Sequence, residues 1–429
     1  MVADMGDDLK SETAFLRKLF DVAVAAADPA VTIPAALPEK PAGRVVVVGA
    51  GKASARMAEV VEQVWGPCEG LVLTRYGYGR PTEVIEIVEA SHPVADAAGQ
   101  AATTRLLALL ESLGPEDFVL CLISGGGSAL LCAPAGEMTL EDKQAVHRVL
   151  LESGAPIAQM NVVRKHMSRV KGGQLGAASH PAKMLCLMIS DVPGDDPADI
   201  ASGATVGERS TPADALEIVA RYGMALPAVA MEVLESASSV VAPGDARLSK
   251  IDNRIISAPS QSLEAARKLA ESRGVRVQIL GDAIEGEARD EGARQAALAL
   301  DVQSGMSAGD APVLLLSGGE CTVSGWGGGI GGPNAEFALA AAMALQGQPG
   351  ISLIACDTDG VDGAAEVAGA VVTEETLARA GALGIDVADV MKRSDSHSFF
   401  AALEDQVVTG PTLTNVNDFR AILIKPLAG

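Results

Sequence analysis

The chain has 429 residues, and its 55 acidic side chains outnumber its 33 basic ones, which gives a net charge of −22. Hydrophobic residues make up 48% and charged residues 21%, a composition typical of a folded globular protein rather than a disordered one. The acidic excess argues against nucleic-acid binding, since phosphate contacts need clustered Lys and Arg, and against docking on an anionic membrane.

The length predicts two domains, because one hydrophobic core rarely supports so many residues. Segment 241–252 combines Pro, Gly and mixed charge, so we expect domains at residues 1–250 and 251–429. The start of the chain lacks a signal-peptide pattern, no run approaches the roughly 20 apolar residues of a membrane span, and the six cysteines form no C-x-x-C pair. We therefore expect buried free thiols and a cytoplasmic protein.

Short apolar runs recur along the chain, and a helical pattern follows each of them. In chain order they occupy residues 44–49, 118–124, 184–191, 254–257, 275–281, 312–318 and 351–357. This alternation predicts an α/β fold, with a doubly wound, largely parallel sheet in the N-terminal domain and a second α/β domain. Ligands of such sheets bind at the carboxyl ends of the strands, so the loops there are the candidate sites.

The first candidate loop, Gly49 to Lys52, joins an apolar strand to a helix. Gly49 and Gly51 would let the backbone approach an anion, the helix N-terminus would supply N–H groups, and Lys52 would add a charge. A tight structural turn is the alternative. The dinucleotide fingerprint fails at Ser54, and a Walker A loop would need Gly where Val46 stands.

Three consecutive glycines between two serines form the second candidate loop. Such a bare turn is costly unless a ligand needs the backbone exposed, so it favours a phosphate cradle. A simple turn is the alternative, and a serine hydrolase is disfavoured because G-x-S-x-G fails at Leu130. The candidate contacts are Ser124, Gly125, Gly126, Gly127 and Ser128.

A basic segment follows. Residues 153–190 hold five basic side chains and no acidic one, whereas a solvated face normally mixes both signs. Within it, polar residues recur at steps of three or four and would share one face of a helix that ends at Gly172. We interpret this face as an anion-recognition surface. Its members are Asn161, Arg164, Lys165, Ser168 and Lys171.

Acidic residues mark two further loops. Asp191 ends an apolar strand, where it could act as a general base or a Mg²⁺ ligand, or only cap a turn. Asp357, Asp359 and Asp362 could hold Mg²⁺ near phosphates, although acidic turns without metal are common and the EF-hand spacing fails. Between them, the glycine-rich stretch 325–332 is expected to close over a ligand.

These segments together resemble the class II glycerate kinases, a glycerate 2-kinase family whose C-terminal part is called MOFRL and some of whose members are called hydroxypyruvate reductase. The resemblance begins near residue 12 and reaches the C-terminus. The motifs that carry it are GAGKAS, LISGGGSALL, NVVRKHMSRVKGG, ISDVPGD, LGDAIEGEAR, LLSGGE, DTDGVDG and VTGPTLTNVNDF, in that order.

The resemblance implies two α/β domains with the active site in the cleft between them, and phosphorylation of D-glycerate at the 2-hydroxyl with ATP and Mg²⁺. It makes Lys52 and Asp191 the catalytic residues. Substrate binding falls to Asn161, Arg164, Lys165 and Lys171. Asp357 and Asp359 are expected to bind the metal. The residues expected to bind the nucleotide are Gly49, Gly51, Ser124, Gly125, Gly126, Gly127, Ser128, Gly318, Gly319, Glu320 and Asn334. The expected partners are a small hydroxy acid and a nucleotide, and the expected state is a monomer or homodimer.

Three departures from the family pattern fall in the C-terminal part. Pro333 stands where the family has Arg in GGRNQE, and Pro cannot replace a guanidinium. The family's DGPTDAAGA and NDSY are also altered, at residues 362–370 and at Ser394 to His397. Two alternatives therefore stay open: an NAD(P)H-dependent hydroxypyruvate reductase, and a family member that binds ligand without turnover.

Overall fold

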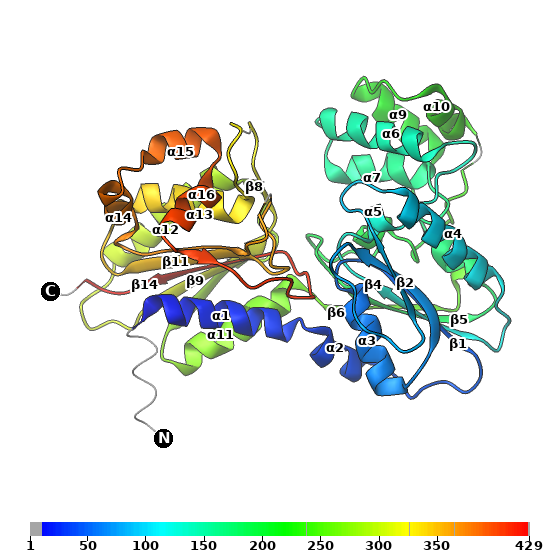
Figure 1. The fold of residues 1–429 in the computed structure, drawn as a ribbon, viewed down its shortest axis with the longest axis horizontal. Helices are drawn as coiled ribbons and strands as arrows, with labels where there is room; N and C mark the ends of the chain where they lie inside the picture. Colours follow the sequence, from blue (N-terminus) through cyan, green and yellow to red (C-terminus); the bar gives the residue numbers. More distant parts are fainter. Residues whose placement is uncertain (1–10, 237, 326, 364, 428–429) are drawn as a thin grey trace. The chain divides into compact units, whose positions relative to one another are not determined.

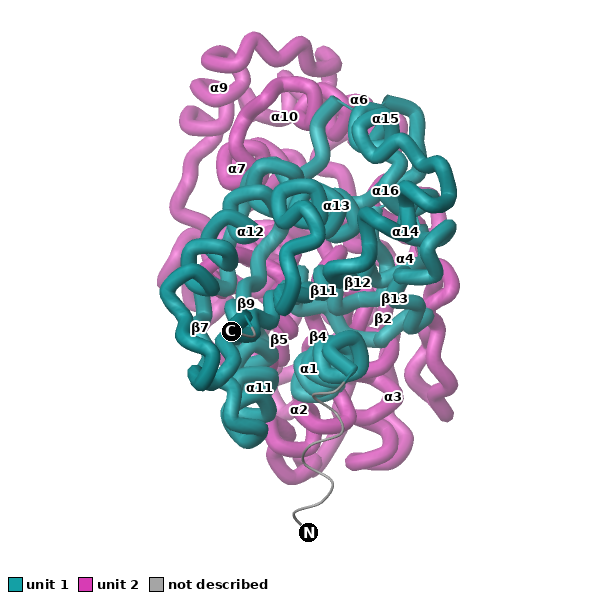
Figure 2. Tube along the Cα trace, turned by 90° about the vertical axis from the view of Figure 1, so that its left-hand side faces the viewer, with its two compact units in different colours: residues 1–28, 258–429 teal, residues 29–257 magenta. Residues whose placement is uncertain are grey.

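The computed structural model describes residues 11–427 except 237, 326 and 364. The chain forms two compact units (Figure 2): unit 2 is residues 29–257, and unit 1 combines the residues up to 28 with 258–429. The predicted α/β fold is confirmed, but the units differ from the expected 1–250 and 251–429. Strand β6 (Ile251–Ser257) pairs with the sheet of unit 2, and helix α1 (Glu12–Ala26) packs on α11 (Pro259–Ser272) in unit 1.

Unit 2 is built on a fully parallel sheet, as predicted. Its order is β3-β2-β1-β4-β5-β6, which is that of a doubly wound sheet. The order reverses between β1 and β4, and a ligand crevice is expected at this switch point. The strands before β6 are β1 (Val45–Ala50), β2 (Glu69–Arg75), β3 (Glu86–Ala90), β4 (Phe118–Ile123) and β5 (Lys183–Ile189).

Helices cover the sheet of unit 2 and add a cap (Figure 1). Around the sheet lie α2 (Pro29–Ala36), α3 (Ser54–Trp65), α4 (Ala97–Glu111), α5 (Gly127–Leu130), α8 (Gln174–Ala178) and the 3₁₀ turns at Ile200–Ser202 and Ala246–Leu248. The helical cap consists of α6 (Leu140–Glu152), α7 (Ile157–His166), α9 (Pro212–Arg221) and α10 (Ala228–Glu235). It has an apolar core of its own, which includes Val146, Leu150 and Val163.

The sheet of unit 1, the predicted second α/β domain, is mixed. Its order is β13-β12-β11-β14-β9-β7, and only the β7–β9 pair is parallel. Helices bury both faces, so the strands read as continuous apolar runs whatever their direction. The strands are β7 (Arg276–Gly281), β9 (Val313–Gly319), β11 (Ile351–Asp357), β12 (Gly369–Val372), β13 (Gln406–Val407) and β14 (Asp418–Ile424), with a separate pair β8 (Gly286–Glu287) and β10 (Cys321–Thr322).

One face of the unit 1 sheet is covered by α1 and α11, whose apolar residues join the sheet in a single core. The other face is covered by α12 (Ala288–Ser304), α13 (Pro333–Leu345), α14 (Thr376–Ala382), α15 (Val387–Arg393) and α16 (Ser396–Ala402). Residues 12–36 have the length and apolar composition of a membrane-spanning helix. In the structure this segment forms two helices, α1 and α2, and Phe15, Leu16 and Phe20 of α1 pack into the sheet core. All six cysteines are buried and free, as predicted.

The substitution Gly49→Ala tests how closely β1 packs against β4 in unit 2. A Cβ at Gly49 would lie 2.1 Å from the Leu122 carbonyl oxygen on the neighbouring strand, so β1 and β4 would have to separate. We expect a loss of about 1–3 kcal/mol in the free energy of unfolding, measured by denaturant titration. Gly114→Ala, whose nearest atom is 3.8 Å away, is the control and should change stability by at most about 0.5 kcal/mol. Equal effects would contradict the packing role.

Candidate active site

The loops after β1 and β4 meet at the switch point and are tied together by hydrogen bonds. The Lys52 N–H donates to the Gly125 carbonyl at 2.8 Å, and the Ala53 N–H donates to the Ser124 hydroxyl at 3.0 Å. The Ser54 hydroxyl donates to the Leu122 carbonyl at 3.0 Å. These contacts fix the entry to α3 against the end of β4.

This packing corrects the role expected of the first loop. Gly51 has φ +151°, and a Cβ there would lie 2.1 Å from the Ser124 hydroxyl oxygen. Gly49 and Gly51 therefore allow a close approach of the chain to itself, and Ser124 is fully buried in that contact. The N–H groups of the loop that leads into α3 already have protein acceptors: those of Gly51, Lys52, Ala53 and Ser54 donate to Leu73, Gly125, Ser124 and Gly51. The structure thus gives Gly49, Gly51 and Ser124 a packing role, and their nucleotide contacts stay predictions.

The second loop does face a site, at Gly126. A Cβ on this residue, whose φ is +82°, would lie 3.0 Å from the His92 ring and 3.4 Å from Cγ of Lys52. Gly127 is instead packed against the Ala50 carbonyl, where a Cβ would be 2.9 Å away. Gly126 therefore has little room for a side chain beside Lys52, which carries a positive charge, and His92, which can carry one.

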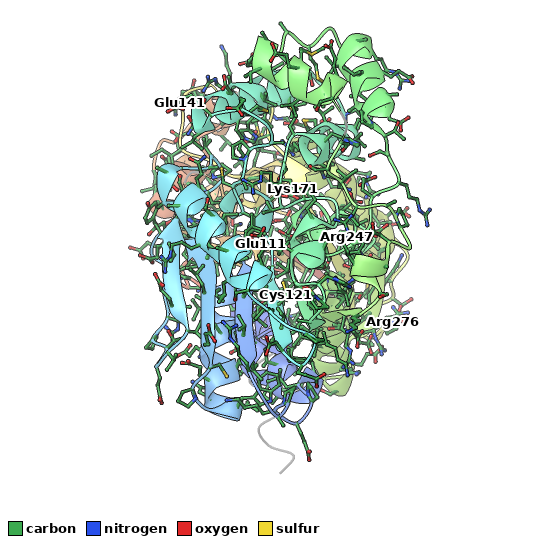
Figure 3. The ribbon with its side chains drawn as sticks, turned by 90° about the vertical axis from the view of Figure 1, so that its right-hand side faces the viewer. Glu111, Cys121, Glu141, Lys171, Arg247 and Arg276 are labelled. Carbon is green, nitrogen blue, oxygen red and sulfur yellow. The ribbon has the colours of Figure 1, made fainter. Side chains whose placement is uncertain are left out.

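Gly126 borders a pocket of about 200 Å³ between the end of the sheet and the helical cap of unit 2. Five of its lining residues are basic: Lys143 and His147 of α6, Arg164 of α7, His92, and Lys171 from the loop after α7. Figure 3 labels Lys171. Ser128 lines it as well, while no Asp or Glu does so among the described residues. The pocket is thus a cluster of positive charge without a carboxylate to balance it.

The pKa values of these groups reflect that crowding. Burial, and then the charges of Lys143 and Arg164, lower the pKa of Lys171 well below its usual value. Burial also lowers the pKa of Lys143 and of Arg164. The pKa of His147 is lowered by burial and by Arg164 and Lys143. An anion beside these groups would favour their charged forms, because an opposite charge favours the ionised form.

Hydrogen bonds hold two of the basic side chains, Lys171 and Arg164, in place. Lys171 Nζ donates to the Ser128 carbonyl at 2.6 Å, and an Arg164 Nη1 donates to Asn161 Oδ1 at 3.1 Å. The Ser128 hydroxyl lies 2.5 Å from that of Ser202. Ser202 has φ +57°, an uncommon conformation for a residue with a Cβ and one often found at functional sites. Asn161 therefore positions Arg164 without lining the pocket itself, and its predicted contact with the substrate stays a prediction.

Lys165 does not belong to the pocket, which corrects the predicted helix face. Its Nζ lies 2.6 Å from the Glu208 carboxylate, and both side chains are at most 10% exposed. Helix α7 ends at His166 instead of continuing to Gly172. The following residues form an irregular segment in which Ser168 bridges to Pro134 and the Arg169 N–H donates to the Ala133 carbonyl.

Asp191 follows β5 directly, on the same carboxyl edge of the sheet as Lys52 and Gly126. The preceding Ser190 N–H donates to the Ser257 carbonyl at 2.9 Å, which continues the pairing of β5 and β6 to the strand ends. The structure therefore places Asp191 where the sequence predicts it. Its chemical role stays a prediction.

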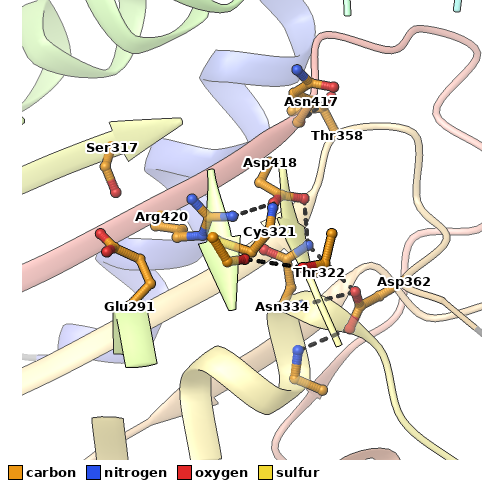
Figure 4. A network of polar contacts seen from close by, with 12 residues as sticks. Glu291, Ser317, Cys321, Thr322, Asn334, Thr358, Asp362, Asn417, Asp418 and Arg420 are labelled. Atoms are coloured by element: carbon orange, nitrogen blue, oxygen red, sulfur yellow. Dashed lines mark hydrogen bonds and ion pairs between the residues drawn. The ribbon is translucent and has the colours of Figure 1, made fainter. Parts of the chain in front are cut away.

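In unit 1, a buried polar network surrounds the start of α13 (Figure 4). Asp362 accepts the N–H groups of Asn334 and Ala335 at 2.9 and 2.8 Å, so a carboxylate caps this helix. The Asn334 side chain donates to Asp418 at 2.6 Å, and Asp418 pairs with the fully buried Arg420. Burial raises the pKa of Asp418, against the lowering effect of Arg420.

The glycine-rich stretch of unit 1 packs against the chain itself, contrary to the expected cover over a ligand. A Cβ at Gly329 or Gly331 would lie 2.5 Å from Asp395 or from the Ser394 carbonyl. A Cβ at Gly319, with φ +123°, would lie 2.2 Å from the Ile284 backbone, and one at Gly318 would lie 3.2 Å from the Asp418 carbonyl. Gly319 therefore does not fit a direct nucleotide contact, while the nucleotide roles of Gly318, Gly125, exposed Glu320 and buried Asn334 stay predictions.

The acidic turn after β11 is held by its own backbone. Asp357 Oδ1 accepts the Asp359 N–H at 2.9 Å, and Asp359 Oδ1 accepts the Val361 N–H at 2.8 Å. Within the parts of the chain that the structure describes, no group of three or more His, Cys, Asp or Glu side chains is arranged to hold a metal. The metal role of Asp357 and Asp359 stays a prediction.

The three departures from the family pattern meet at Asp362. Pro333 is the first residue of α13, where its fixed φ suits a helix start. His397 Nε2 lies 3.0 Å from the Asp362 carbonyl and 3.1 Å from its carboxylate. The changed residues therefore share one packing environment.

Several residues of these sites escaped the sequence analysis. Lys143 and His147 lie on a helix that also carries Glu141, Asp142 and Glu152, so no one-signed charge run marks it. Asp418 and Arg420 lie in a strand with an otherwise apolar pattern. A polar residue inside such a strand was the available signal, because a buried charge needs a partner.

Comparison with known proteins agrees with this architecture. Residues 15–235 match a family described as a domain of unknown function, DUF4147, and residues 313–418 match the MOFRL family. A proposed hydroxypyruvate reductase of Agrobacterium vitis is 51% identical, over 95% of this chain and 94% of its own length. D-glycerate 2-kinase of Thermotoga maritima is 38% identical, over 89% of this chain and 91% of its own. The crystal structure of glycerate kinase from Thermotoga maritima superposes with a TM-score of 0.86 at 35% identity, over 97% of this chain and all of that one.

A two-unit α/β kinase fold with a cationic pocket is the class that these observations define. The chain belongs to the glycerate kinase family, in which a DUF4147 domain precedes a MOFRL domain.

The cationic pocket predicts anion-dependent stability. Inorganic phosphate should raise the melting temperature of the full chain, because an anion that binds only the folded state stabilises it. Arg164→Met should remove most of the increase, while Arg169→Met, at an exposed neighbour, should leave it intact. The increase should shrink as the pH rises, and should do so at a lower pH than an ordinary lysine would cause, because burial lowers the pKa of Lys171. Equal shifts in the two variants would contradict the assignment.

The Lys165–Glu208 pair predicts a change of stability without a change of ligand affinity. Lys165→Met removes the ion-pair partner of the Glu208 carboxylate, which then keeps the hydrogen bond from the Ser210 N–H, and this should cost about 1–3 kcal/mol. Denaturant titration should show the loss, and adding Glu208→Gln should restore part of it. The phosphate affinity of the folded variant should match that of the wild type. If Lys165→Met lowered the phosphate affinity without lowering the stability, Lys165 would have to be a ligand-binding residue of the pocket.

Proposed function

We propose that this chain transfers a phosphoryl group from ATP to the 2-hydroxyl of D-glycerate, with Mg²⁺ as the required metal. The observation that carries the proposal is the pocket of unit 2, where Lys143, Arg164 and Lys171 meet without a carboxylate beside Lys52 and Gly126. Family membership supports the same activity, since relatives over most of the chain are named glycerate kinases.

The acceptor acid is held by its carboxylate. Arg164 presents a planar fork of N–H donors that suits a carboxylate, and Asn161 fixes its orientation. Lys171 adds a buried charge whose hydrogen bond to the Ser128 carbonyl sets its direction. Binding in this pocket places the acid at the carboxyl edge of the sheet, the edge that also carries Lys52 and Asp191.

The chemical step requires positioning and charge stabilisation, without a covalent enzyme intermediate. The 2-hydroxyl oxygen bonds to the γ-phosphorus of ATP, and the bond from that phosphorus to the bridging oxygen breaks as ADP leaves. Asp191 accepts the hydroxyl proton. Lys52 stabilises the negative charge on the transferring group, as a fixed cation does best in a site that excludes water.

Carboxylates supply the hard oxygen ligands that Mg²⁺ prefers, commonly one or two together with substrate phosphates. Asp357 and Asp359 have this chemistry and stand two residues apart in one turn. The metal would neutralise phosphate charge. ATP would be bound by backbone N–H groups and small residues of the loop that contains Gly126.

The reductase alternative takes its support from the name of the Agrobacterium vitis relative and from the sheet order. The loop geometry opposes it. A dinucleotide pyrophosphate approaches the backbone of the glycine loop after β1, and the N–H groups of Gly51, Lys52 and Ala53 in that loop already have protein acceptors. Strand β2 ends in Arg75, not in the acidic residue that would hold a ribose.

Kinetic assay of the purified chain tests the proposal. With ATP, Mg²⁺ and D-glycerate we expect ADP and 2-phosphoglycerate, identified by phosphorus NMR, and no product after chelation of the metal. Lys52→Ala and Asp191→Asn should each lower kcat by about 10²-fold or more, since each removes a transition-state interaction. Arg169→Met, outside the site, is the folded control.

Two results would contradict the proposal. One is kcat within tenfold of wild type in both the Lys52→Ala and Asp191→Asn variants. The other is oxidation of NADH or NADPH by hydroxypyruvate without any phosphorylation of glycerate, which would favour the reductase.

A further inference from the structure

The pocket of unit 2 has two walls of different chemistry. One is the basic cluster already described, and the other is apolar, with Met138, Val146, Leu150 and Met167 each less than 10% exposed. Helix α6 contributes to both, because Lys143, Val146, His147 and Leu150 recur at steps of three and four and so share one face. A ligand that fills the pocket touches charge at one end and hydrocarbon at the other.

Glycerate uses only part of this pocket. Its substituent is a hydroxymethyl group, which a selective site would recognise through hydrogen bonds. The apolar wall offers none, and Gln144, the amide nearest to it on α6, already donates to the Ala95 carbonyl at 2.8 Å. The volume of about 200 Å³ far exceeds the about 10–15 Å³ that a single water needs. Such a pocket discriminates only weakly against an apolar substituent. Burying the substituent there makes the binding free energy more favourable.

We propose that the pocket accepts 2-hydroxy acids whose substituent is apolar and larger than the hydroxymethyl group of glycerate. The carboxylate is held by Lys143, Arg164 and Lys171, and the substituent lies against Met138, Val146 and Leu150. The inference rests on the proposed function for the fate of the bound acid. The binding itself does not depend on phosphoryl transfer.

A series of acids of increasing chain length tests it on the full chain. We would measure the Kd by calorimetry and kcat/KM with ATP and Mg²⁺ for D-glycerate, D-lactate, D-2-hydroxybutyrate and D-2-hydroxy-4-methylpentanoate. Each added buried methylene favours binding by about fourfold. The affinity should therefore rise at least about tenfold from lactate to the longest acid.

A matched pair of α6 variants locates the effect. Val146→Thr replaces a methyl group of the apolar wall by a hydroxyl of similar size, and it should reduce the longest-acid to lactate affinity ratio at least about threefold. Val149→Thr makes the same change on the same helix at a residue outside the pocket lining, and it should leave the ratio unchanged. The chain-length series on the wild type remains a test if a variant does not fold.

The outcomes separate this inference from the proposed function. If the longer acids bind with rising affinity and neither they nor D-glycerate is phosphorylated, the inference stands and the kinase proposal fails. If glycerate is phosphorylated and affinity is flat or falls with chain length, the inference is overturned and the kinase proposal stands. Equal ratios in the two variants would also overturn it.

Discussion

The close approach of β1 to β4 is the constraint on which the rest of unit 2 depends. It exists because Gly49 and Gly51 have no Cβ to collide with Leu122 and Ser124. The contact sits where the strand order reverses, and it fixes the start of α3 and the turn into α5 before any ligand arrives. Lys52 and Gly126 come together as a consequence. The bare glycines thus serve the ligand site indirectly, by allowing the scaffold to close on itself.

Much of the fold could be predicted because apolar runs report burial. A strand covered on both faces is apolar throughout, so the apolar runs predicted β1, β4, β5, β6, β7, β9 and β11 but not their directions. Strand β14 was not among the predicted strands, and it pairs antiparallel with both β9 and β11. The predicted boundary at 250/251 lies near the division at 257/258, whereas helix α1, predicted in the N-terminal domain, belongs to unit 1. The packing of α1 on α11 joins segments more than 230 residues apart, and local composition carries no trace of such a contact.

Only some residues of the candidate site could be predicted from the sequence, again for physical reasons. Arg164 and Lys171 stood out in an acid-free segment. Lys165 shared that signal and proved to be paired with Glu208, since neighbours on a helix point about 100° apart. Lys143 was hidden by the acidic residues around it on α6. Glycine motifs were the most ambiguous signal, because a bare backbone admits a phosphate and a neighbouring strand equally well.

The net charge of −22 and the cationic pocket have to be understood together. At long range the acidic protein repels an anion, so recognition must come from short-range contacts with desolvated cations. Those cations are costly to bury, and burial lowers the pKa of Lys171 well below its usual value for this reason. A carboxylate beside Lys171 would raise that pKa again, because an opposite charge favours the ionised form. The cluster therefore favours anions over neutral molecules, since only an anion offsets the cost of keeping these cations buried.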